Sequence, residues 1–357
     1  MSNIHKPQTQ DVLKLFSARR IIWPVLIGLG VASFLLYRNF DAHAFASISW
    51  TWNSTLWILI SFLMVVVRDV AYMYRVRVLT NNELTWRRSF DVIMLWEFAS
   101  AVNFSLLGGG FAFAIAIISM EKIKLGRSIS VVMFTSFLDG LFFAIMAPLV
   151  YFTVGKDFLF GPLNNASLQK ISYGQGLHVT FWIIYFVVVA YKILVGYALF
   201  INARAVRHLL EKIFSLRFLR RWRRKAVEIG EEMEIASKEL QGKSLGYWLK
   251  SFGATFVSWT ARYIIVNCIV KAFTTEVISH YILYARQVVM GLLVLVSPSP
   301  GGSGFAEFMF SNFLGEFVPN GLSASLALLW RIISYYPYIF IGVIVLPRWI
   351  RRVFKVE

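Results

Sequence analysis

Stretches of about 20 mostly apolar residues recur along the chain, and they constrain its fold more than any other feature. They cover residues 21–37, 55–79, 129–153, 177–201, 247–272 and 322–346. A helix of about 20 apolar residues crosses the hydrocarbon core of a bilayer. Because 58% of the residues are hydrophobic and only 15% are charged, we predict an all-α, polytopic helical membrane protein with about six full spans.

Two more apolar regions, residues 90–120 and 277–318, are interrupted by helix-breaking residues. The breaking residues are Gly108, Gly109 and Gly110 in the first region and Pro298, Pro300, Gly301, Gly302 and Gly304 in the second. Lipid cannot hydrogen-bond a broken backbone, so such breaks survive at membrane depth only where they are buried in protein or line a polar cavity. We therefore expect these residues to form hinges and cavity backbone, as in transporters.

The distribution of basic residues predicts the topology. The formal net charge is +17, but the basic residues cluster beside the apolar stretches, where the positive-inside rule explains them without nucleic-acid binding. The rule places residues 1–20 and the C-terminus in the cytoplasm. The first apolar stretch is predicted to be an uncleaved anchor rather than a signal peptide. The expected location is a cytoplasmic membrane of the bacterial type, that is, an inner membrane.

The same rule gives both interrupted regions an even number of crossings, so each is predicted to be a re-entrant hairpin. The hairpins would enter from opposite faces, each between two full spans. Residues 21–357 would then form a single membrane domain with two units of opposite orientation, about 55–153 and 247–346, and a basic amphipathic segment, 203–246, between them. Such inverted repeats place a substrate site near the bilayer midplane. The alternative is that the hairpins are ordinary pairs of tilted spans.

Charged side chains lie inside the apolar stretches, where each costs roughly 2.5–3.5 kcal/mol on insertion scales. Arginine carries a planar fork of donors that matches phosphate oxygens, and acids nearby would balance charge or bind a cationic group. The predicted substrate-binding residues are Arg68, Asp139, Arg262, Arg286, Glu307 and Arg331. The alternative is that each arginine forms a structural pair with an acid, namely Asp69, Asp139, Glu97 or Glu307.

Other chemistry is not supported. The five histidines and the single Cys268 show no metal-ligand spacing. The stretch that ends in Gly242-Lys243-Ser244 has Ser237 where a phosphate-binding loop has its first glycine. We predict no metal site, no cofactor and no catalytic residue.

Several motifs resemble the transmembrane flippase domain of the lysylphosphatidylglycerol synthase family over roughly residues 52–350. The main one runs from Pro298 to Glu307, and Arg331 with Gly342, Arg75 with Arg77, and Asp139 also fit. In the first hairpin the family has an acid and an arginine where this chain has Phe111 and Ala114. Members that synthesise aminoacylated lipid carry a soluble C-terminal domain, whereas this chain stops at Glu357. The resemblance therefore implies lipid translocation rather than synthesis.

The expected function is a flippase that moves an anionic or zwitterionic phospholipid, or a lipid-linked intermediate, between leaflets through a central polar cavity. Membrane lipids are the expected partners, and a homo-oligomer and a separate lipid-modifying enzyme remain open. The rival hypotheses are an integral-membrane transferase, for which Glu97, Asp139 and Glu307 are the candidate bases, and a non-catalytic membrane scaffold.

Overall fold

The computed structural model describes residues 37, 50–102, 109–161, 168–216, 220–274, 279–295, 297, 302, 304–319 and 321–354. The described part contains helices and no strand, and five helical stretches in it are long and apolar enough to cross a membrane, of which the last, Ser323–Val353, consists of two consecutive helices. This confirms a polytopic helical membrane protein. The predicted span at residues 21–37 lies outside the described residues except for Tyr37.

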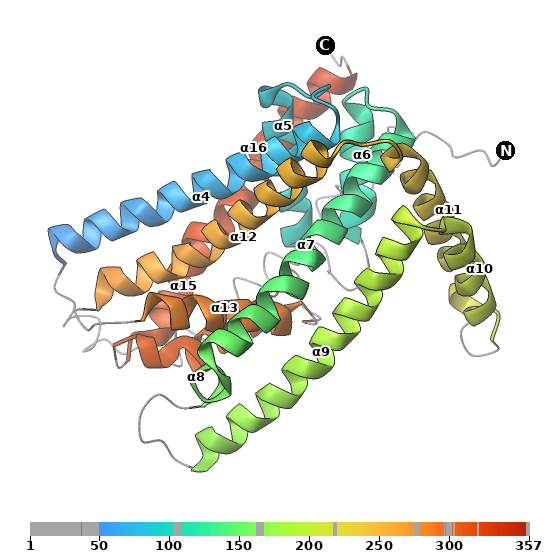
Figure 1. Ribbon diagram of the computed structural model, residues 1–357. Coiled ribbons are helices and arrows are strands. Elements are labelled where there is room, and N and C mark those ends of the chain that lie inside the picture. Colours follow the sequence, from blue (N-terminus) through green and yellow to red (C-terminus); the bar gives the residue numbers. More distant parts are fainter. Residues whose placement is uncertain are drawn as a thin grey trace.

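The described helices follow the predicted order along the chain (Figure 1). The first unit contains α4 (Trp52–Leu79), α5 (Trp86–Val102), α6 (Gly109–Met120) and α7 (Leu125–Val154). The connecting helices are α8 (Lys156–Phe160), α9 (Leu168–Phe200), α10 (Ala203–Ile213), η2 (Arg220–Trp222) and α11 (Arg223–Leu240). The second unit contains α12 (Leu245–Phe273), α13 (His280–Val294), α14 (Phe305–Met309), a π-helical turn η4 (Phe310–Leu314), η5 (Gly315–Phe317), α15 (Ser323–Ser334) and α16 (Tyr336–Phe354).

Helices α4 and α12 lie side by side and run in opposite directions (Figure 1). At one end, Trp50 lies just before α4 and Phe273 is the last residue of α12, and the centroids of their rings are 5.8 Å apart. At the other end the Lys243 ammonium, just before α12, donates to the amide oxygen of Asn81, just after α4, at 2.9 Å. The first helices of the two units are therefore antiparallel.

The two units also exchange contacts. Helix α5 of the first unit packs on α16 of the second, and α13 of the second packs on α7 of the first. Figure 1 shows α5 and α6 at one end of the α4–α12 pair and α13 at the other. Neither α6 nor α13 is long enough to span a bilayer. This arrangement has the geometry that two oppositely oriented hairpin units require, and their re-entry into a bilayer stays a prediction.

Local sequence explains where α4 and α12 begin and where α4 ends. The Thr51 hydroxyl caps α4 by accepting the Ser54 N–H at 3.2 Å, and the Ser244 hydroxyl caps α12 by accepting the Tyr247 N–H at 3.3 Å. Asn81 and Asn82 after α4 have φ of 53° and 60°. Asparagine tolerates this left-handed backbone, which stops the helix.

The predicted span 322–346 is not one continuous helix. It is divided into α15 and α16 at Tyr335, which has φ −131° and ψ −56°. Pro337 explains the break, because proline has no N–H to continue the helical ladder. The N–H of Tyr338 bonds to the carbonyl of Tyr335, which leaves the Ser334 carbonyl to accept the Arg68 guanidinium at 3.4 Å. The break thus creates a polar contact between α15 and α4.

The segment 203–246, predicted as one amphipathic segment, is divided in its described part into α10, the short helix η2 and α11, and it ends with the first residues of α12. Helix α10 packs on α11, and α11 packs on α7 and α9.

Glu121, directly after α6, connects the first unit to α16. Its carboxylate accepts a hydrogen bond from the indole of Trp349 on α16 at 2.8 Å. Burial raises the pKa of Glu121, although Arg352 lowers it in part.

Gly342 allows α16 to approach α5 closely, because a Cβ at this position would overlap the ring of Phe98. We expect Gly342→Ala to lower the free energy of unfolding by about 1–3 kcal/mol, since overpacking forces the backbone or the ring to move. Gly253→Ala is the matched control, because a Cβ there meets nothing within 4 Å. It should be neutral or stabilising by about 0.5–1 kcal/mol. Unfolding in SDS titrations measures both, and equal effects would contradict the close approach.

Candidate functional site

A cavity of about 260 Å³ lies where the two units meet. Helices α4, α5, α12, α13, α15 and α16 all contribute to its wall. Its charged lining residues are Arg68, Glu97, Arg262 and Arg331. Its aromatic lining residues are Trp259, Tyr263, Trp330, Tyr335 and Tyr338. The structure thus brings three of the four predicted binding arginines to one cavity, together with aromatic side chains.

A second cavity of about 210 Å³ adjoins the first. The two have four lining residues in common, Glu97, Ser100, Trp259 and Arg262. Along α4, Arg68 lines the larger cavity and Arg75 the smaller one, and seven helical residues correspond to a rise of about 10 Å. We call these the larger and the smaller cavity. They lie one above the other along α4 and are separated by the shared residues.

Every arginine of this region has an acid within 4.0 Å. The shortest distances are 3.1 Å for Arg68–Asp69, 2.6 Å for Arg75–Asp139, 3.7 Å for Arg262–Glu97, 3.3 Å for Arg286–Glu316 and 2.8 Å for Arg331–Glu307. Arg68, Arg262 and Arg331 therefore have partners among the acids considered for structural pairs, whereas Arg286 pairs with Glu316, which was not among them. These pairs do not fill the space between the units, because the two cavities remain. The Arg262–Glu97 contact is the longest and exceeds hydrogen-bond distance.

The three arginines that line the larger cavity each form a cation–π contact with an aromatic ring. The guanidinium carbon lies 4.7 Å from the Tyr338 ring centroid for Arg68, 5.0 Å from that of Trp259 for Arg262, and 4.2 Å from that of Tyr335 for Arg331. Cation–π contacts stabilise a charge without occupying all its N–H donors. Arg262 in particular keeps a positive charge at the junction of the two cavities.

Arg286 lies outside the lining of both cavities. Its donors are occupied by the backbone carbonyls of Phe158 at 2.9 Å, Phe313 at 3.0 Å and Gly161 at 2.7 Å, as well as by Glu316. The side chain is 3% exposed. Arg286 therefore ties α13 to the chain after α7 and to the π-helical turn, and we do not include it in the site.

The two predicted acids lie at opposite ends of the site. Asp139 lines the smaller cavity and accepts from Arg75 and, at 3.0 Å, from the indole of Trp259. Glu307 caps α14 by accepting the Gly304 N–H at 2.7 Å, and it accepts from Arg331 at 2.8 Å. Glu307 thus holds Arg331 in place at the wall of the larger cavity.

The structure describes four of the eight residues predicted to form hinges and cavity backbone. Gly302 lines the larger cavity with φ 69°, and Gly304 precedes α14 with φ 83°. These left-handed values favour glycine. Gly109 and Gly110 form the first turn of α6. The remaining predicted positions, Gly108, Pro298, Pro300 and Gly301, lie outside the described residues.

Sequence reasoning omitted several lining residues from the predicted site. Gln287 was visible as a polar residue in an apolar stretch, next to Arg286, but it lines the larger cavity where Arg286 does not. Ser100, Tyr263, Tyr335 and Tyr338 carry no charge, so hydropathy gave no signal for them. Among the described residues no group of three His, Cys, Asp or Glu side chains could hold a metal ion.

The family profile described as "Lysylphosphatidylglycerol synthase TM region" matches residues 21–342. The chain belongs to this family. A protein of Archaeoglobus fulgidus named "UPF0104 membrane protein" is 24% identical over 301 residues, which cover 81% of this chain and 85% of that protein. No solved structure matches the chain. The Lysylphosphatidylglycerol synthase TM region family relates the chain to lipid handling in a membrane, and it agrees with the resemblance found at Pro298–Glu307.

Proposed function

We propose that the protein is a lipid flippase that moves the head group of an anionic or zwitterionic phospholipid, or of a lipid-linked intermediate, through the two cavities. The observation that carries the proposal is a polar cavity at the contact of two antiparallel units, lined by Arg68, Arg262 and Arg331. Charges inside a membrane domain are costly and mark substrate pathways. Guanidinium groups match phosphate oxygens.

The size of the larger cavity supports a head group rather than a whole lipid. Pockets that enclose drug-sized ligands measure roughly 300–1,000 Å³, and this one measures about 260 Å³. The acyl chains would therefore remain in the bilayer. The head group would pass from one cavity to the other at the shared residues, where the Arg262–Glu97 contact of 3.7 Å must open. A phosphate replaces Glu97 as the partner of Arg262 in that step.

The proposed function also implies a membrane location, a topology and partners for the protein. Both termini face the cytoplasm of a bacterial-type inner membrane, since the basic segments flank the spans on that side. Membrane lipids are the partners, a homo-oligomer and a separate lipid-modifying enzyme are compatible with the site, and the protein moves lipid without chemical change.

Reconstitution into vesicles tests this proposal. Vesicles that contain the full-length protein and a trace of head-group-labelled phospholipid are treated with a membrane-impermeant reductant, which destroys label in the outer leaflet only. We expect the protein to let the reductant reach nearly all the label, against about half in protein-free vesicles. If exchange remains at the protein-free rate for phosphatidylglycerol, phosphatidylethanolamine and total lipid from the native membrane, the proposal fails. Conversion of the label to a new lipid species would favour the transferase hypothesis instead.

A scaffold is the second candidate, because all five arginines of this region are paired with acids. Under that hypothesis the arginines only hold helices together. Replacement of any of them would then change folding yield but never leave a folded protein with slower lipid exchange.

A further inference from the structure

Three residues that line the larger cavity each carry a buried polar atom with no hydrogen-bond partner among the described residues. They are the Nε of Arg262, the hydroxyl of Tyr263 and the Oε1 of Gln287. Buried polar groups are nearly always paired, and an unpaired one is costly. Three such groups around one cavity indicate the hydrogen-bonding pattern of what occupies it.

The orientation of the Gln287 amide follows from a chain of hydrogen bonds. Asn267 donates through Nδ2 to the His280 carbonyl at 2.8 Å, so its Oδ1 must be an acceptor. Gln287 donates to that Oδ1 through Nε2 at 2.7 Å and to the Leu283 carbonyl at 3.2 Å. Both partners of this nitrogen are acceptors, so a flipped amide would lose both bonds. Gln287 therefore keeps Oε1 as a fixed acceptor, and its side chain is fully buried.

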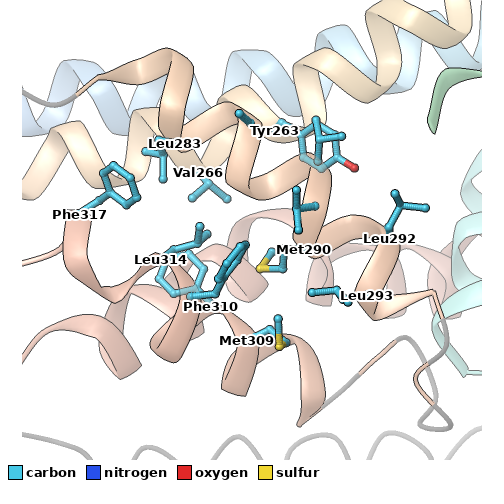
Figure 2. Close-up of a cluster of buried hydrophobic side chains, with 14 of the residues drawn as sticks. Tyr263, Val266, Leu283, Met290, Leu292, Leu293, Met309, Phe310, Leu314 and Phe317 are labelled. Carbon is cyan, nitrogen blue, oxygen red and sulfur yellow. The ribbon is translucent and has the colours of Figure 1, made fainter. Parts of the chain in front are cut away.

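The other two atoms complement this acceptor. The Nε of Arg262 can only donate, and the Tyr263 hydroxyl can donate or accept. Figure 2 shows Tyr263 beside the apolar cluster of α12 and α13, with its hydroxyl oxygen turned away from Val266 and Leu283. Gly291 leaves room for that hydroxyl, because a Cβ there would overlap it. Two residues of the wall on neighbouring helices thus carry an unpaired donor and an unpaired, fixed acceptor.

We propose that the larger cavity selects head groups that carry a hydrogen-bond donor, a hydroxyl or an N–H, beside the phosphate, and that Gln287 accepts from this donor. Arg262 then donates to the phosphate. This inference rests on the proposed function and specifies its substrate class. A head group without a donor leaves Oε1 of Gln287 unpaired and binds about tenfold more weakly.

Two pairs of lipids test the selection at constant charge. Phosphatidylethanolamine has N–H donors and phosphatidylcholine has none. Phosphatidylglycerol has hydroxyl donors and phosphatidylmethanol has none. The purified full-length protein is equilibrated with equal amounts of one pair, and native mass spectrometry gives the ratio of bound lipids. We expect the donor lipid to be preferred about tenfold in both pairs.

Substitutions attribute the preference to Gln287. Gln287→Leu should reduce the ratio to about one in both pairs, by weakening the donor lipids. Asn267→Leu should reduce it in part, because the amide of Gln287 can then flip. Gln241→Leu is the matched control, since it makes the same substitution at an exposed residue after α11 that lines neither cavity, and it should keep the wild-type ratio. Gel filtration and the melting temperature in detergent check that each variant is folded.

Equal binding within both pairs by the wild-type protein would overturn the inference, even if no Gln287 variant folds. Water alone in the cavity would give the same equal ratios. The binding ratio does not depend on transport, so the two proposals fail separately. A protein that prefers donor lipids but does not exchange them between leaflets contradicts the proposed function only. A protein that exchanges lipids without this preference contradicts the selection only.

Discussion

Replacing Arg331 with methionine is expected to lower the free energy of unfolding by about 3–5 kcal/mol, because it leaves Glu307 as a buried, uncompensated charge. Both side chains of this pair are only 6% exposed, and Nε donates to Oε1 at 2.8 Å. Glu307 cannot turn to water, since its other oxygen accepts the Gly304 N–H at 2.7 Å. Unfolding in SDS titrations, followed by tryptophan fluorescence, measures the loss.

The double variant Glu307→Gln with Arg331→Met is the control for this result. Glutamine keeps an oxygen for the Gly304 N–H but carries no charge, so the double variant should recover most of the lost stability. If the single and double variants are equally destabilised, or if the single variant loses less than about 1 kcal/mol, the pair is not the buried contact described here.

Replacing Arg262 with glutamine is expected to slow lipid exchange in vesicles by at least about tenfold while the protein stays folded. A hydrogen bond to a charged group contributes about 1.5–3 kcal/mol, and each 1.4 kcal/mol corresponds to about tenfold. The cost to folding should be small, because the Arg262–Glu97 contact is 3.7 Å long and its side chains are 32% and 23% exposed. Partly exposed pairs contribute about 0–1 kcal/mol.

Arg88→Gln is the matched control for Arg262→Gln. Arg88 is also paired with an acid, Glu121 at 3.6 Å, but its side chain is 41% exposed and it lines neither cavity. Its variant should exchange lipid at the wild-type rate. A folded Arg262→Gln protein with the wild-type rate would show that the cavity junction is not on the lipid pathway.

Hydropathy and charge predicted the spans but not all of the site. The five described spans agree in position, although the last is divided at Tyr335, because the length of an apolar stretch is a local property of the sequence. Arg68, Arg262 and Arg331 were placed in one interior because a charge in an apolar stretch must avoid lipid. The break at Tyr335 was missed, although Pro337 signals it, because the apolar composition continues across it.

The identity of each partner could not be predicted, because it depends on how distant segments approach one another. Arg286 and Arg331 look alike in the sequence, yet Arg286 is saturated by carbonyls of the chain after α7 while Arg331 lines the larger cavity. The orientation of the Gln287 amide is likewise fixed by Asn267 on another helix. That bond joins two helices and leaves no periodic signal in the sequence.

The central claim is that the larger cavity holds a phospholipid head group, and electron cryomicroscopy of the full-length protein in lipid nanodiscs tests it most directly. The account predicts density for one head group between Arg262 and Gln287, with acyl chains leading from it into the bilayer. A map in which this space is closed by side chains, or holds water alone, with the lipids confined to the outer surface, would contradict it.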